Sequence, residues 1–521
     1  MVERTLDDPA QPPETPVKFG APLPPRLLAA LGGATLAFVA LTDWLFFGHP
    51  TGWTLGLYGL VLLEALLWRD RRFPAGRPRA VIAAALVLLF LGCIEEPNRL
   101  VVTLAGLGLI TLALSFREGW RDSAVDWAQR WIVYGFLSWF FLPASVAGSA
   151  AAARRRPVVR GGGSFLSKWS LAGVLCALFL WLFSAANPII EGWLASFRQT
   201  LADAFDTLPT VPRMLFWLAT ACQVWALLGF RSGLDKQNLD FLEQGPRTNP
   251  GGFLAPAAVL RALAAFNLLF AVQTVLDLFY LWGGAALPDG LTYAQYAHRG
   301  AYPLIATALL AATFVLLAFR PGAPDTHRRR ACLLVYAWLA QNVFLVVSSA
   351  WRLRLYVEVY TLSRMRVAAA VWMLLVACGL VWILVRIATG RSNRWLVNVN
   401  ALTAAGVLFV CAFPNLDGAI ARFNVQRCEE IRGKGEGFPA IDVAYLESLG
   451  YDTLPALLWL ADRCGDHPRA APRLRHAILR LEGQLQGDLS DWRGWTFRRA
   501  RLRRLLRERA AAPAAADGAF I

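Results

Sequence analysis

Charged and aromatic side chains gather at two breaks in the apolar pattern of this sequence. The first break, residues 280–300, ends in the letters TYAQYAHRG and carries His298 and Arg299. The second, residues 352–366, is rich in arginine, and clustered arginines recognise phosphate and carboxylate groups. We therefore expect these arginines to be held by protein carboxylates or by an anionic ligand such as a lipid phosphate, whereas the competing interpretation is a belt of arginine and aromatic residues at a membrane surface. The polar residues of the second break are Arg352, Arg354, Tyr356, Glu358, Tyr360, Arg364 and Arg366.

Helical spacing predicts two contacts within the second break. Arg354 and Glu358 lie four residues apart, so a helix would bring them together as an ion pair. Tyr356 and Tyr360 have the same spacing and would share one face of that helix.

An acidic residue also lies within an apolar run, because Asp277 occupies the middle of residues 266–282. A charge inside a membrane costs several kcal/mol unless it is paired or hydrated. Arg261 is on the same run, but it lies about 24 Å away along a helix. We therefore expect the partner of Asp277 to come from another helix, either as a structural ion pair or as part of a functional site.

Membrane-spanning helices must position these polar residues, because long apolar runs fill the first four-fifths of the chain. The sequence is 56% hydrophobic and only 17% charged, whereas soluble chains carry roughly 25% charged residues. At roughly 20 residues per crossing, the runs predict about twelve helices, and their continuity argues against a β-barrel. The predicted fold class is therefore all-α, a polytopic transmembrane bundle with a small C-terminal helical domain. The predicted spans are residues 27–47, 52–68, 80–94, 98–116, 131–151, 170–188, 214–230, 257–283, 302–319, 331–350, 367–388 and 395–413.

This pattern predicts a disordered N-terminal tail (1–26), a transmembrane domain (27–413), a helical extramembrane domain (414–510) and a disordered end (511–521). Residues 189–208 read as an amphipathic helix in the membrane interface, either a connector between spans or a lid.

The net charge of +16 reflects arginines in short loops, which orient membrane helices. No nucleic-acid-binding module accompanies these arginines, so we expect no nucleic-acid partner. The loops predict an inner (plasma) membrane protein with a cytoplasmic N-terminus and an extracytoplasmic C-terminal domain. If all twelve segments crossed the membrane, the basic loops could not all lie in the cytoplasm. Either one segment between residues 95 and 153 is re-entrant, or the charge rule fails at one end of the chain.

The segment after residue 414 reads as a series of short helices. Asp417 and Asp442 are candidate N-caps, and Pro455 suits the first turn of a third helix. A last helix, from about Ser490, carries seven arginines that either lie against anionic lipid headgroups or form a solvated face. This domain could also bind a protein partner.

Six of the eight cysteines lie in apolar runs, where cysteine acts as a small hydrophobic residue. Cys428 and Cys464 lie in the polar C-terminal segment, and outside the cytoplasm they could form a disulfide; two free thiols fit the sequence equally well. No spacing of cysteine and histidine fits a zinc site, so we expect no metal and no cofactor.

Several segments resemble a bacterial membrane family known only as a domain of unknown function, the 4173 group, with the 4153 group as a similar relative. The similarity covers roughly residues 260–465, through LFYLWGG, TYAQYAHRG and WRLRLYVEVYTLSRMRVAAAVWM. His298 stands where the family pattern has arginine, and Thr361-Leu-Ser stands in place of Gly-Leu-Thr. The resemblance implies no activity. The C-terminal residues that match the family's closing pattern are Asn415, Asp417, Asn424, Asp442 and Tyr445.

Three functional hypotheses remain. We favour a membrane scaffold or signalling component whose helical C-terminal domain binds a partner. The alternative is a transporter or binder of a lipid or another anionic substrate, which would use the arginines of residues 352–366 and Asp277. A third hypothesis is an integral-membrane transferase with Asp277 or Glu358 as base, although no nucleophile elbow, phosphate loop or HExxH motif supports an enzyme.

Overall fold

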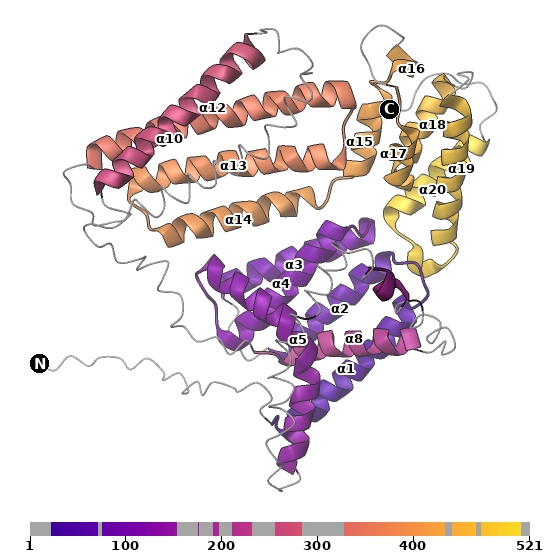
Figure 1. The fold of residues 1–521 in the computed structure, drawn as a ribbon. Helices are drawn as coiled ribbons and strands as arrows, with labels where there is room; N and C mark the ends of the chain where they lie inside the picture. The colour runs from indigo at the N-terminus through magenta and orange to yellow at the C-terminus, as the bar shows by residue number, and fades with distance from the viewer. Residues whose placement is uncertain are drawn as a thin grey trace, which may run out of the picture. The chain divides into compact units, whose positions relative to one another are not determined.

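The structure, a computed structural model, describes residues 22–70, 76–153, 191–196, 211–231, 256–283, 328–432, 440–464 and 470–511, together with residues 176 and 199. These residues form helices and no strands (Figure 1). The chain divides into two compact units. The first comprises residues 1–90, 105–121 and 126–236, and the second comprises residues 91–104, 122–125 and 237–521.

Among the described residues, nine helices are long and apolar enough to cross a membrane. The all-α, polytopic prediction is therefore confirmed. Helix α2 (Trp53–Arg69) has 17 residues, the short limit for one crossing. The predicted spans 170–188 and 302–319, and most of the predicted interfacial helix 189–208, lie outside the described residues. The nine are α1 (Pro25–Phe46), α3 (Arg77–Glu95), α4 (Arg99–Glu118), α5 (Ala124–Ala153), α8 (Val211–Gly229), α10 (Pro256–Leu276), α12 (Arg328–Tyr360), α13 (Arg364–Thr389) and α14 (Asn393–Cys411).

In the first unit, close helix packing depends on small residues. A Cβ atom at Gly59 of α2 would lie 2.1 Å from a ring carbon of Phe90 of α3, so only glycine lets these two helices approach so closely. The end of α8 is capped by Arg117 of α4, which donates hydrogen bonds to the carbonyls of Leu227 (2.6 Å) and Phe230 (3.2 Å). This arginine satisfies carbonyls that a helix terminus otherwise leaves unpaired.

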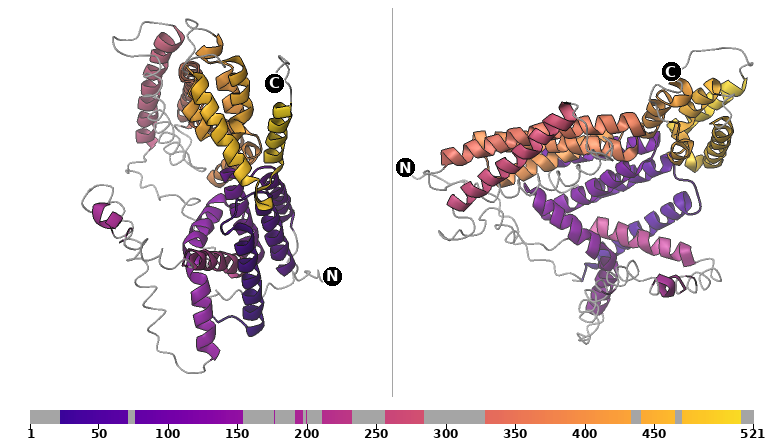
Figure 2. Two further views of the ribbon diagram at one scale, coloured as in Figure 1. Left: turned by 90° about the vertical axis from the view of Figure 1, so that its right-hand side faces the viewer. Right: turned by 45° about the horizontal axis from the view of Figure 1, so that its top comes forward.

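In the second unit, α12, α13 and α14 run side by side (Figures 1 and 2). Trp338 of α12 is fully buried and meets Phe270 of α10 edge to face, with ring centroids 6.5 Å apart. A short π-helix, η2 (Asp277–Trp282), continues α10. Helix α12 extends to Tyr360, ten residues beyond the predicted end of its span at residue 350, so most of the predicted break 352–366 is helix, because the arginine-rich sequence continues the helical pattern.

The C-terminal helices of the second unit, residues 416–511, are here called the tail. Leucines from several of them, including Leu454, Leu457 and Leu474, form one fully buried core. The predicted cap at Asp442 is confirmed, since its side chain accepts from Tyr445 N. The tail helices are α15 (Leu416–Val425), α16 (Glu429–Arg432), α17 (Val443–Ser448), η4 (Tyr451–Thr453), α18 (Leu454–Arg463), α19 (Ala470–Asp488), η5 (Trp492–Gly494) and α20 (Phe497–Ala511).

Two predicted helix starts in the tail need correction. The cap of α15 is Asn415 and not Asp417, because the Asn415 side chain accepts from Gly418 N at 2.9 Å. The arginine-rich helix begins at Phe497 and not near Ser490, because the short η5 turn, capped by Asp491, occupies the intervening residues.

Candidate functional site

The tight turn between α12 and α13 organises the polar residues of the second break. Among the described residues, Thr361 is the one non-glycine residue with a positive φ, at 66°. A β-branched residue rarely adopts this left-handed conformation. Arg366 stabilises the turn by donating hydrogen bonds to the carbonyls of Tyr360, at 2.5 Å, and Thr361. Ser363 then caps α13 by accepting from Arg366 N.

The tail binds this turn through residues of the family-like pattern. Asn424 is 2% exposed; its amide accepts from Leu362 N (2.8 Å) and donates to Leu362 O (2.9 Å). Arg364 forms two hydrogen bonds to Asp417, at 2.6 and 2.7 Å. The backbone N–H of Arg364 also donates to the Tyr445 hydroxyl at 2.9 Å. We call these contacts of residues 361–364 with Asp417, Asn424 and Tyr445 the turn joint.

A groove lies between α12 and α13, beside α15 of the tail, with a volume of about 1210 Å³. Its walls are apolar and include Val346, Ala350, Leu374 and Ala377. Its polar rim is formed by side chains from α12, from α13 and from the turn that follows α15. These rim residues are Arg354, Glu358, Arg366 and Arg427.

Aromatic rings and one carboxylate hold the rim arginines. Arg354 pairs with Glu358 at 3.1 Å, as the spacing predicts. The Arg366 guanidinium lies over Tyr356, 4.6 Å from the ring centroid, and Arg427 lies 4.2 Å from that of Phe423. Three arginines and one glutamate leave the rim with a net charge of +2. The rim can therefore receive an anionic group while the walls receive an apolar chain.

Asp277 and Arg352 form a separate buried ion pair between η2 and α12, with Asp277 0% and Arg352 4% exposed. Gln273 also donates to Asp277 Oδ1 at 2.9 Å. The expectation that Asp277 is paired from another helix is confirmed. Arg352 does not line the groove, so the predicted cluster separates into an ion pair, a turn joint and a groove rim. His298 and Arg299 lie outside the described residues.

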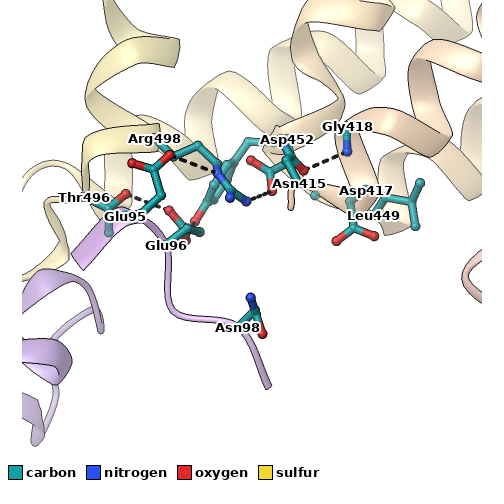
Figure 3. Close-up of polar contacts among 12 residues, drawn as sticks. Glu95, Glu96, Asn98, Asn415, Asp417, Gly418, Leu449, Asp452, Thr496 and Arg498 are labelled. Atoms are coloured by element: carbon teal, nitrogen blue, oxygen red, sulfur yellow. Dashed lines mark hydrogen bonds and ion pairs between the residues drawn. The ribbon is translucent and has the colours of Figure 1, made fainter. Parts of the chain in front are cut away.

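A second set of contacts holds the tail to the connection between α3 and α4, and the sequence analysis missed it. Glu96 accepts a hydrogen bond from Thr496 at 2.6 Å (Figure 3). It also accepts from Arg499 at 2.9 Å and from Tyr451 at 3.2 Å. We call these contacts, and those of Arg498 and Arg501 with Glu95, the loop joint. Two adjacent glutamates directly after an apolar run were its sequence signal, because such charges must be paired near a membrane.

Burial changes the acid–base properties of groups in the tail. Asp452 accepts from Arg498 at 3.0 Å, yet burial raises the pKa of its carboxyl above the usual value (Figure 3). Cys428 and Cys464 are both buried thiols of the tail core. Burial raises the pKa of the Cys428 thiol to about 12, which keeps it protonated. The disulfide between these two residues stays a prediction.

Comparisons with known proteins place the chain in a family without giving it an activity. No curated protein and no solved structure matches it. The resemblance to the 4173 group is corrected to its relative, since a model of the Domain of unknown function (DUF4153) matches residues 60–460. That match covers the α12–α13 turn and the residues of the turn joint, and it includes Glu95, Glu96 and Tyr451 of the loop joint but not the arginines of α20. The chain is a polytopic membrane protein and belongs to the DUF4153 family.

Proposed function

We propose that this protein binds an anionic membrane lipid in the groove between α12 and α13, with the lipid phosphate at the arginine rim. The observation that carries the proposal is the combination of a rim of net charge +2 with apolar walls in one cavity of about 1210 Å³. A soluble anion would use the rim alone, whereas an amphiphile uses both parts.

The dimensions of the groove support a lipid. Its lining residues on α12 run from Val346 to Glu358, a length of about 18 Å along a helix. Half of a hydrocarbon core is about 15 Å thick, so the groove matches the depth of one leaflet. The rim arginines then lie at the level of lipid headgroups, where arginine side chains reach toward phosphate.

The turn joint connects the groove to the tail. Asn424 lies in the last turn of α15, and Arg427 lies two residues after the end of that helix at Val425; the first binds Leu362 and the second forms part of the rim. Tail residues of the family-like pattern are therefore engaged within the chain, which favours lipid binding over a scaffold that presents them to a partner. No observation favours the transferase hypothesis.

The test uses the full chain in nanodiscs that contain spin-labelled lipids. Wild type should immobilise spin-labelled phosphatidylglycerol in preference to phosphatidylcholine. The double variant Arg354→Gln with Arg427→Gln should lose this preference, since both side chains are exposed at the rim and neither supports the turn. The matched control, Arg475→Gln with Arg504→Gln, removes two exposed arginines of the tail that do not line the groove.

Equal lipid preference in the rim variant and the wild type would reject the proposal. Competition by inorganic phosphate, without competition by unlabelled phosphatidylglycerol, would show that the rim binds a free anion and would also reject it.

A further inference from the structure

The ends of three membrane helices lie close together in the second unit. Helix α3 ends at Glu95, α4 begins at Arg99 and α14 ends at Cys411. Asn98 connects them: its amide donates to Ala412 O at 2.8 Å, and its oxygen accepts from Val101 N at the start of α4. Because all three are candidate spans, the boundary of the hydrocarbon core passes close to this cluster.

The loop between α19 and α20, residues 489–496, is fixed to that level. Thr496 donates to Glu96 at 2.6 Å, directly beside the end of α3 (Figure 3). The same Thr496 hydroxyl caps α20 by accepting from Arg499 N at 3.1 Å, and Arg499 itself pairs with Glu96. Thr496 is fully buried, so the position of the loop is set by a desolvated polar network.

This loop exposes large aromatic side chains. Trp492 is 48% exposed, and Phe497, the first residue of α20, is 52% exposed. Arg493 stacks over Trp492, 5.1 Å from the ring centroid, and pairs with Asp491 at 2.9 Å, so this arginine holds the indole in place. Exposed tryptophan and phenylalanine are unfavourable in water, but tryptophan concentrates at membrane interfaces.

We propose that Trp492 and Phe497 insert into the bilayer interface and form a lipid-contacting foot of the tail. The occupant is a membrane surface rather than a protein, because the network around Glu96 holds these residues where three spans end. Phe413, two residues after α14 and 38% exposed, supports the same level. This contact is separate from the groove, since none of these residues lines it.

Depth measurements on the full chain test the foot. Nitroxides are attached at position 492 or 497 of a variant whose accessible cysteines are replaced, in nanodiscs containing phosphatidylglycerol. The matched control is a nitroxide at Gln484, an exposed residue of α19. We expect positions 492 and 497 to collide more often with apolar oxygen than with a water-soluble nickel chelate, and position 484 to show the reverse.

Two results would overturn the proposal. The same preference for the nickel chelate at all three positions would place the foot in water. Protection of positions 492 and 497 from both reagents would mean that a protein covers them. In a second variant, Trp492→Ala with Phe497→Ala, a nitroxide attached at position 493 should collide more often with the nickel chelate than it does without these substitutions. Thr496 and Glu96 are left unchanged in this variant.

Discussion

The turn joint and the loop joint both hold the tail through an arginine–carboxylate pair, but the pair is exposed in the turn joint and buried in the loop joint. In the turn joint, the charged side chains are open to water, with Arg364 55% and Asp417 26% exposed. In the loop joint, Arg499 and Glu96 are only 6% and 9% exposed. Exposed ion pairs contribute about 0–1 kcal/mol, whereas loss of one partner of a buried pair costs about 3–5 kcal/mol. The two ion pairs therefore contribute unequally to the stability of the tail, although both join an arginine to a carboxylate at hydrogen-bonding distance.

The largest effect is expected from Glu96→Ala. This substitution leaves Arg499, Thr496 and Tyr451 without their shared acceptor, and should cost about 3–5 kcal/mol of tail stability. Limited proteolysis of the purified protein, read as release of the tail at increasing urea, measures this loss. The matched control is Glu95→Ala, because Glu95 is 37% exposed and its loss should cost no more than about 1 kcal/mol. Equal damage from both variants would contradict the comparison.

The sequence predicted what depends on local pattern, and missed what depends on distant pairing. Apolar periodicity identified the spans, and a spacing of four identified the Arg354–Glu358 pair. No local rule connects Glu96 with Arg499, because they lie 403 residues apart. Likewise, a carboxylate at position 277 required a partner, but only the fold identifies Arg352. The resemblance places glycine where this chain has Thr361, and the positive φ at this position is one that glycine adopts more readily than threonine.

The turn joint should depend chiefly on its buried amide and less on its charges. Asn424→Ala removes both hydrogen bonds to Leu362 and leaves a backbone N–H and carbonyl without partners, at a cost of about 1–3 kcal/mol. The same proteolysis assay measures the effect. Arg422→Ala, at an exposed position of the same helix, serves as control and should leave the release of the tail unchanged. If Arg422→Ala lowered the stability of the tail more than Asn424→Ala did, the outer face of α15, and not its buried amide, would stabilise the joint.

Thr361→Gly should stabilise the turn joint, whereas Asn424→Ala should destabilise it. A left-handed conformation costs a residue with a side chain about 1–2 kcal/mol, and glycine removes this cost while losing about 0.5–1 kcal/mol through its larger freedom when unfolded. We expect a small net stabilisation of the turn joint, visible as a higher urea midpoint for tail release. A lower midpoint would mean that the threonine side chain itself stabilises the turn.

The loop joint should also respond to pH through Asp452. Burial raises the pKa of this carboxyl above its usual value of 3.8, so the folded tail binds the proton more tightly than the unfolded chain. Its ionisation therefore destabilises the tail as pH rises above about 3.8, and the loss is complete above the raised pKa. Asp452→Asn should lack this part of the pH dependence while keeping an acceptor for Arg498. Melting temperatures of both proteins across this pH range provide the measurement, and parallel curves would contradict the prediction.

The smallest effect is expected from Asp417→Asn, although its two hydrogen bonds to Arg364, at 2.6 and 2.7 Å, are shorter than the bond of 2.9 Å between Arg499 and Glu96. An exposed pair should contribute about 0–1 kcal/mol, and salt should reduce this further because the Debye length falls to about 3 Å at 1 M ionic strength. In the proteolysis assay, the difference between wild type and Asp417→Asn should therefore vanish at high salt. The difference between wild type and Glu96→Ala should persist, because desolvated charges are screened little. If salt removed both differences alike, water would have to reach Glu96, and the contrast between the two joints would be lost.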